Sequence, residues 1–94
     1  MPDLAAILNL EPKRVEVMGV SLQLRRPTVA DLAEALHVNA DGEGKGNAWM
    51  LWRHVQHPDG RPVFADVEAA AAAPLAFAMK LIPLIEGLYA EGRD

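Results

Sequence analysis

Three side chains in the middle of the chain have residue types and spacing that suit a metal site. His54 and His57 stand three residues apart, which places two imidazoles on one face of a helix, and Asp59 follows in the next turn. A catalytic zinc ion normally takes three such ligands and keeps a fourth position open. The histidines, however, precede a Pro-Asp-Gly turn, and no His-Glu-x-x-His pattern accompanies them. We therefore interpret both as exposed side chains that complement the dipole at a helix C-terminus, and a metal-dependent enzyme is a distant alternative.

The other chemically capable residues lack a context that would activate them. Ser21 is the single serine, and no Gly-x-Ser-x-Gly elbow surrounds it. Gly42, Gly44 and Gly46 alternate, but no predicted strand precedes them and no Gly-Lys-Ser/Thr follows, so a phosphate-binding loop is not indicated. His37, near a predicted helix end, has the same interpretation as the two histidines above. We expect a non-enzymatic protein with no catalytic residue, no cofactor and no bound metal.

Composition narrows the range of partners. The 94 residues are 51% hydrophobic and 23% charged, which suits one globular domain with one core. Thirteen acidic residues against nine basic ones give a net charge of −4, and this disfavours nucleic acid and anionic membranes as partners. Cysteine is absent, so no disulfide or thiolate chemistry is expected. We expect a soluble cytoplasmic protein, residues 1–94 forming a single domain, without a signal peptide.

The elements that must position these residues begin with a β-hairpin. Residues 1–13 are expected to form a short helical turn or a flexible arm. Residues 14–25 alternate apolar and polar side chains, and Gly19 supplies a tight turn between two strands. We expect the inner face of the hairpin to consist of Val15, Val17, Leu22 and Leu24. Because a lone hairpin is marginal in water, helices must cover it.

Residues 28–90 are expected to be helical, with a flexible loop at 39–47. Thr28 and Asp31 match a capping box that starts a helix ending near Val38. The side chains that we expect this helix to bury are Val29, Leu32, Ala33 and Leu36. A second helix is expected from Asn47 to His57, with Trp52 in its buried stripe.

Turn signals divide the remainder of the helical part. The Pro58-Asp59-Gly60 segment predicts a turn, and an extended piece follows at 61–64. Asp66 can cap the next helix, and Pro74 can open a last helix over 75–90, which Pro83 should kink or split. The sequence thus predicts an α+β fold that is predominantly helical, with an N-terminal hairpin packed on three or four helices.

The last predicted helix carries more apolar surface than a surface helix needs. One stripe consists of Phe77, Leu81, Leu84 and Leu88, and a second consists of Leu75, Met79, Ile82, Ile85 and Tyr89. Together they span roughly 200° of the circumference, against the ~100° expected of a helix that covers a core. Either this helix is central and packed on both sides, or one stripe is an interface for self-association or for a partner helix.

Two residues of the second predicted helix extend the interface alternative. Trp49 lies at the margin of the inward stripe, so it either packs at the edge of the core or anchors a partner. Met50 lies on the opposite side of the helix. The residues that we predict to contact a partner are Trp49, Met50, Phe77, Leu81, Leu84 and Leu88.

Two segments carry a resemblance to a known family. The hairpin leads into Leu24-Arg25-Arg26-Pro27-Thr28-Val29-Ala30-Asp31, and the aromatic helix leads into Val55-Gln56-His57-Pro58-Asp59-Gly60-Arg61-Pro62-Val63-Phe64-Ala65-Asp66. With the Gly-rich loop between them and the Ala/Leu-rich end, these segments resemble the small tail assembly chaperones of long-tailed bacteriophages and prophages. The similarity extends over about residues 14–90.

The resemblance implies a protein without catalytic residues that acts in the bacterial host cytoplasm and is absent from the mature virion. Chaperones of this family bind the long, helical tape measure protein, keep it soluble and help to recruit tail tube subunits. The alternative is a small structural adaptor, a minor tail or head–tail protein of the phage particle.

Overall fold

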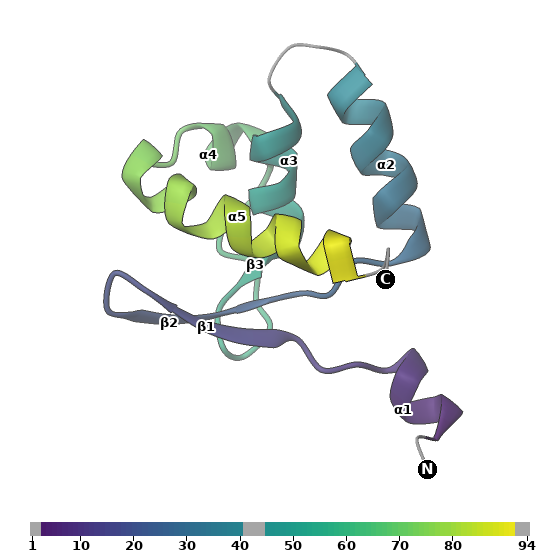
Figure 1. The fold of residues 1–94 in the computed structure, drawn as a ribbon. Coiled ribbons are helices and arrows are strands. Elements are labelled where there is room, and N and C mark those ends of the chain that lie inside the picture. Colours follow the sequence, from purple (N-terminus) through teal and green to yellow (C-terminus); the bar gives the residue numbers. More distant parts are fainter. Residues whose placement is uncertain (1–2, 41–44, 92–94) are drawn as a thin grey trace.

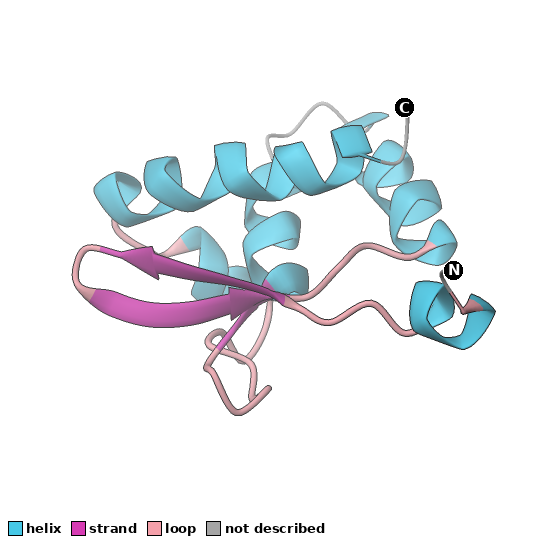
Figure 2. Ribbon diagram, turned by 60° about the horizontal axis from the view of Figure 1, so that its bottom comes forward, coloured by secondary structure: helices cyan, strands magenta, loops and turns pink. Residues whose placement is uncertain are grey.

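The computed structural model describes residues 3–40 and 45–91 (Figure 1). Within these residues the chain forms five helices and three strands. Their bounds are Leu4–Leu8 (α1), Lys13–Val17 (β1), Val20–Leu24 (β2), Val29–Ala40 (α2), Lys45–His54 (α3), Val55–Gln56 (β3), Val67–Ala71 (α4) and Leu75–Glu91 (α5). The main helices lie along one face of the sheet (Figure 2), which confirms the predicted α+β fold with a packed N-terminal hairpin.

The hairpin forms at the predicted place and with the predicted inner face. Strands β1 and β2 pair antiparallel, from Lys13 opposite Leu24 to Val17 opposite Val20. The two residues between them, Met18 and Gly19, have φ angles of 53° and 81°. Positive φ at both central positions is characteristic of a type I′ turn, whose twist matches that of the flanking strands. Alternation then directs three of the expected residues into the core, Val17, Leu22 and Leu24, while Val15 is half-buried.

A third strand replaces the end of the second predicted helix, so the prediction that this helix reaches His57 is wrong. Helix α3 ends at His54, and Val55 and Gln56 pair antiparallel with Leu24 and Gln23 of β2. The His54 carbonyl accepts a hydrogen bond from the Arg25 N–H at 2.8 Å. The Gln23 amide also donates to the Gln56 amide oxygen at 2.8 Å. Pairing with the hairpin therefore ends the helix three residues early.

Helix α2 buries a different face from the one that its sequence predicts. Val29, Leu32 and Leu36 are 89%, 44% and 61% exposed, and Ala33 is exposed as well, so the expected buried stripe is wrong. The inward face instead presents Asp31, which is 2% exposed. Ala35 lies four residues later on that same face and is also buried. On that face Asp31 forms ion pairs with two arginines, described below, and these contacts favour the observed orientation of the helix.

The remaining helix boundaries agree with the sequence more closely. The predicted capping residue of α4 is confirmed, since the Asp66 carboxylate accepts a hydrogen bond from the Ala69 N–H at 2.8 Å. Gly60 has the positive φ, 93°, that the turn requires. Helix α5 is not split at Pro83, which lies on its exposed side.

The loop predicted over 39–47 is shorter than expected. Helix α2 continues to Ala40, and α3 begins at Lys45. Gly42 and Gly44, with the centre of the predicted flexible connection, lie outside the described residues.

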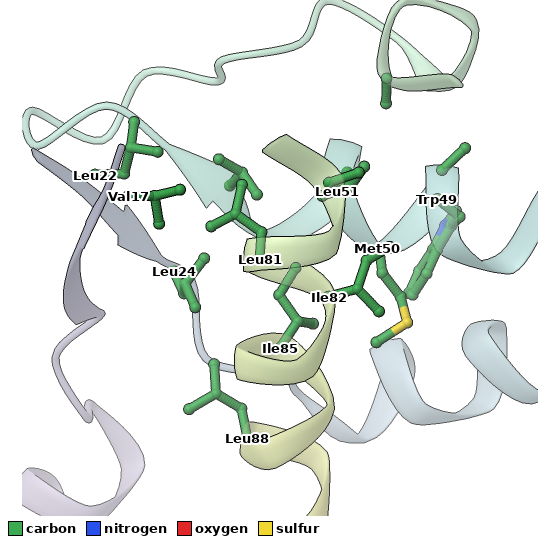
Figure 3. Packing of buried hydrophobic residues seen from close by; sticks show 14 of the residues in the cluster. Val17, Leu22, Leu24, Trp49, Met50, Leu51, Leu81, Ile82, Ile85 and Leu88 are labelled. Carbon is green, nitrogen blue, oxygen red and sulfur yellow. The ribbon is translucent and has the colours of Figure 1, made fainter. Parts of the chain in front are cut away.

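The core lies on both sides of α5, which settles the packing of that helix. On one side are Val17, Leu22 and Leu24 of the hairpin, and on the other are residues of α3, as Figure 3 shows. Leu81 and Ile85 are 0% exposed between these two layers. Packing on two faces explains most of the wide apolar surface of α5, although Leu75 and Met79 of the second stripe are 74% and 59% exposed. The residues of α5 that are buried are Ala78, Leu81, Ile82, Ile85 and Leu88.

Candidate functional site

His54 is a buried core residue, not an exposed helix-end histidine, so that prediction is wrong. Its side chain is 0% exposed and packs edge-on against Trp49 and Tyr89, with ring centroids 5.9 and 5.4 Å away. Nδ1 lies 2.8 Å from the Arg25 carbonyl oxygen, which can only accept, so Nδ1 carries the proton. Nε2 then accepts from the Tyr89 hydroxyl at 2.7 Å. Both ring nitrogens are thus occupied by hydrogen bonds, and neither is free for a metal ion.

Burial sets the charge state of this histidine–tyrosine pair. Burial lowers the pKa of His54 below its ordinary value, although the hydrogen bond to Arg25 and the charge of Asp31 oppose the shift. Burial also raises the pKa of Tyr89 to about 12, with a further contribution from Asp31. Both groups are therefore neutral at pH 7, which matches the tautomer required by their hydrogen bonds.

Asp31 is the second buried polar group and lies within the same cluster. Its carboxylate accepts hydrogen bonds from Arg53 Nε at 2.7 Å and from the Thr28 N–H at 3.0 Å. Arg25 Nη1 lies 3.6 Å from the same carboxylate. Burial favours the neutral acid, but the Thr28 and Arg53 hydrogen bonds and the charges of both arginines outweigh it and lower the pKa of Asp31. The Asp31 N–H in turn donates to the Thr28 hydroxyl at 3.2 Å, which confirms the predicted capping box.

The remaining members of the candidate metal site, His57 and Asp59, do not form a ligand group with His54. Asp59 accepts from the backbone N–H of Arg61 at 3.0 Å and from its guanidinium at 2.6 Å. These contacts, the backbone bond above all, lower the pKa of Asp59. His57 is half-buried and His37 is exposed. In residues 3–40 and 45–91, no three His, Cys, Asp or Glu side chains are grouped as a metal ion would require.

The predicted partner contacts divide into core residues and residues near the surface. Leu81 and Leu88 are 0% and 4% exposed and lie in the centre of the core, so in this fold neither presents surface to a partner. Phe77 and Leu84 are half-buried against that core. Phe77 also packs edge-on against Phe64, with ring centroids 6.5 Å apart.

Met50 is 8% exposed and belongs to the core, so the prediction that it lies opposite the inward stripe is wrong, but it also lines a surface groove. The groove has a volume of about 460 Å³ and lies between α2, α3 and α5. It is lined by the polar side chains of Asn47 and Glu86, by Gly87, and by the apolar residues Leu32, Ala35, Leu36, Met50, Tyr89 and Ala90. Trp49, 7% exposed, lines a separate depression beside Asp31 and Arg53. Leu32 and Leu36 in the α2 wall of the groove are two of the four residues that the sequence placed in the core.

A second apolar surface lies on the N-terminal arm. All five residues of α1 are exposed, and Leu4, Ile7 and Leu8, at helical spacing, are 67%, 52% and 72% exposed. Leu10 follows at 60% exposed. Figure 1 shows α1 at the end of an extended segment, away from the main helices.

Sequence reasoning expected the arm as a short helical turn or a flexible segment, but it missed the groove. An apolar stripe on an amphipathic segment predicts burial, and nothing local indicates that Leu32 and Leu36 face outward. One signal was present in the charged residues around the capping box. Arg25 precedes Thr28 by three residues, and Arg53 lies on a neighbouring predicted helix, so both segments offer a cation that could accompany Asp31 into the core.

Comparisons of the chain with protein-family models, with curated proteins and with solved structures find no match. In the part of the chain that the structure describes, no helix combines the length and apolar character needed to cross a membrane.

Proposed function

We propose that this chain is a non-enzymatic tail assembly chaperone of a bacteriophage or prophage. It binds the tape measure protein in the bacterial cytoplasm, keeps it soluble during tail assembly, brings tail tube subunits to it and leaves before the virion is complete. The proposal is supported by the resemblance of residues 24–31 and 55–66 to that family, with the capping box and the turn in these segments formed as their residues predict.

The exposed apolar groove is the observation on which the binding role depends. A tape measure protein exposes apolar helical stripes until the tail tube encloses it. A groove between helices accepts such a stripe through side chains at positions i, i+3, i+4 and i+7. Leu32 and Leu36 lie one turn apart on α2, and Met50 and Tyr89 contribute flexible and aromatic lining opposite them. These residues are suited to a client helix whose exact sequence varies.

Co-expression tests this proposal. The partner is the longest helix-rich protein encoded beside this chain, produced with and without it. We expect the partner to become soluble and to co-purify with this chain. Leu36→Asp, in the groove, should reduce the recovered complex at least tenfold, because it places a charge against the client stripe. Leu75→Asp is the matched control, since Leu75 is 74% exposed and does not line the groove.

Two results would contradict the proposal. A partner that stays insoluble in the presence of this chain would remove the chaperone role. Mass spectrometry that finds this chain at stoichiometric levels in purified phage particles would replace it with the structural adaptor role.

A further inference from the structure

A small pocket at the junction of the sheet and α3 has two arginines and no acidic side chain in its wall. It has a volume of about 200 Å³ and lies where the β2–α2 connection, the end of α3 and strand β3 meet. We call it the arginine pocket, and the residues that line it are Arg25, Trp52, Arg53, Val55, Gln56 and Pro62. The exposed Glu34 lines the depression on the other side of Arg53 instead.

Asp31 neutralises only one of these two arginines. Its carboxylate accepts a hydrogen bond from Arg53 Nε at 2.7 Å, whereas Arg25 Nη1 lies at 3.6 Å, beyond hydrogen-bond distance. Arg25 Nη1 is buried and donates no hydrogen bond within the described residues. One carboxylate against two guanidinium groups leaves an excess of one positive charge beside the pocket. Because the charge of a guanidinium is delocalised, an anion in the pocket is attracted to Arg25 without contact with Nη1 itself.

The hydrogen-bond acceptors around the arginine pocket are occupied, whereas its donors are not. The backbone carbonyls of Arg25 and Val55 accept hydrogen bonds from other parts of the chain, at 2.8 and 3.3 Å. The Gln56 side-chain oxygen accepts from Gln23 at 2.8 Å, which leaves the Gln56 amide nitrogen to donate elsewhere. Within the described residues, neither that nitrogen nor the Nη atoms of Arg53 donate a hydrogen bond. Unused donors beside occupied acceptors favour an anion over a cation as ligand.

Size and the apolar part of the lining narrow the class of anion. The volume is below the ~300 Å³ at which sites for drug-sized ligands begin, so the ligand is small. The planar fork of an arginine matches a carboxylate, to which it donates two parallel hydrogen bonds. Trp52 and Pro62, which both keep accessible surface, can cover a short carbon body attached to that carboxylate. Inorganic phosphate, hydrated on every side, gains nothing from these two rings.

We propose that the arginine pocket binds a carboxylate group that carries a short carbon body. The carboxylate pairs with the guanidinium groups of Arg25 and Arg53, and the Gln56 amide nitrogen donates a further hydrogen bond to it. A free organic acid, an acidic side chain of a peptide and a peptide C-terminus all present this chemistry. Because both arginines are partly exposed to water, binding is weak, with a Kd on the order of 1 mM.

Proton–nitrogen NMR spectra of the full chain test the proposal, because its two tryptophans give two indole signals. Trp52 lines the arginine pocket and Trp49 does not, so the second signal is an internal control. Propionate is titrated from roughly 0.1 to 50 mM at pH 7 and constant ionic strength. We expect saturable shifts of the Trp52 indole signal and of the guanidinium signals of Arg25 and Arg53. Propionamide, which has nearly the same shape and no charge, should leave these signals unchanged.

Matched variants attribute the binding to the pocket. Arg25→Gln should weaken propionate binding at least about tenfold, because it removes the excess positive charge. Arg14→Gln removes the same charge from an exposed position of the hairpin and should change the Kd by less than about twofold. Gln56→Glu retains an oxygen that can accept from Gln23 but places a negative charge in the pocket, so it should abolish binding. Circular dichroism should show all three variants folded, since none of the changed side chains is fully buried.

Two further probes distinguish the sources of the carboxylate. N-acetylalanine presents a peptide C-terminus, and the methylamide of N-acetylaspartate presents an acidic side chain within a peptide. A lower Kd for one of these than for propionate assigns the pocket to that part of a peptide, whereas a lower Kd for propionate assigns it to a free acid.

Four outcomes would overturn the proposal. A Trp52 signal that does not shift with any of the three carboxylates shows that the pocket binds none of them. Equal shifts with propionamide show that charge plays no part. Equal weakening by Arg25→Gln and Arg14→Gln shows general attraction to the surface, and tighter binding of inorganic phosphate than of every carboxylate shows a site of another class. Because these measurements use the chain alone, they are independent of whether it binds a tape measure protein.

Discussion

The orientation of α2 depends on Asp31, and Asp31→Asn tests this dependence. The carboxylate is 3% exposed and accepts hydrogen bonds from Arg53 and Thr28. Asparagine has nearly the same shape, so it removes the charge with little change of volume. The charge-assisted bond to Arg53 is worth about 1.5–3 kcal/mol, and removing one partner of a buried pair costs about 3–5 kcal/mol.

Partial solvent exposure of Arg53 reduces the loss of stability that we expect from Asp31→Asn. The side chain of Arg53 is 35% exposed, so water can solvate its guanidinium group after the charge is lost, whereas Nη1 of Arg25 is buried without a hydrogen-bond partner. We therefore expect Asp31→Asn to lower the free energy of unfolding by about 2–3 kcal/mol, toward the lower end of these ranges. Urea unfolding at pH 7, followed by circular dichroism, measures the change.

A matched variant and a double-mutant cycle make the test specific. Glu34→Gln removes the same charge from the exposed side of α2 and should change stability by no more than about 0.5 kcal/mol. Asp31→Asn combined with Arg53→Gln should show a coupling of at least about 1 kcal/mol. A loss below about 1 kcal/mol for Asp31→Asn, or additive effects in the cycle, would refute the conclusion that this ion pair holds the rotation of α2.

Three further predictions concern pH, the hairpin turn and the core. Because burial lowers the pKa of His54, the unfolded chain takes up a proton below pH ~6.5 that the folded chain does not. The free energy of unfolding should therefore fall as pH decreases, by up to about 1.4 kcal/mol per pH unit. Urea midpoints measured above, at and below that pH report the change, and His54→Gln should flatten the slope. Met18→Asn should raise the free energy of unfolding by about 0.5–1 kcal/mol, because asparagine tolerates the positive φ of this turn better than methionine does. Met18→Val should lower it, and equal urea midpoints for both variants would argue against a type I′ turn. Ile85→Ala should lower the free energy of unfolding by about 3–4 kcal/mol, whereas Leu75→Ala, on the exposed side of the same helix, should lower it by less than about 0.5 kcal/mol. A small loss of stability for Ile85→Ala in thermal unfolding would show that α5 is not central.

Local patterns predicted most of the architecture. Alternation of apolar and polar residues over 14–25 placed the hairpin and its buried residues, because a period of two directs every second side chain to the same face. The capping box at Thr28 and Asp31 and the cap at Asp66 were also correct, since each depends on side chains within three residues of the helix start. The wide apolar surface of α5 indicated two alternatives, and one of them, packing on both sides, is the observed one.

The candidate site was less predictable because it is made by contacts between distant segments. His54 was interpreted as an exposed helix end, yet Arg25 and Tyr89, 29 and 35 residues away, bury it and occupy both of its nitrogens. Strand β3 likewise forms because the backbone of β2 offers hydrogen bonds to Val55 and Gln56. In both cases the contacting residues lie too far away in the sequence for a local pattern to indicate them.

The sequence by itself determined the hairpin and most of the helices of this protein, their caps and turns, and its acidic, cysteine-free composition. Only the tertiary structure decided which faces meet. On α2, the sequence offers an apolar stripe and a single aspartate, and local hydrophobicity favours burial of the stripe. The two arginines that surround Asp31 come from the β2–α2 connection and from α3, and the observed orientation pairs Asp31 with them while Leu32 and Leu36 stay exposed. The groove and its exposed leucines therefore depend on contacts between residues far apart in the chain.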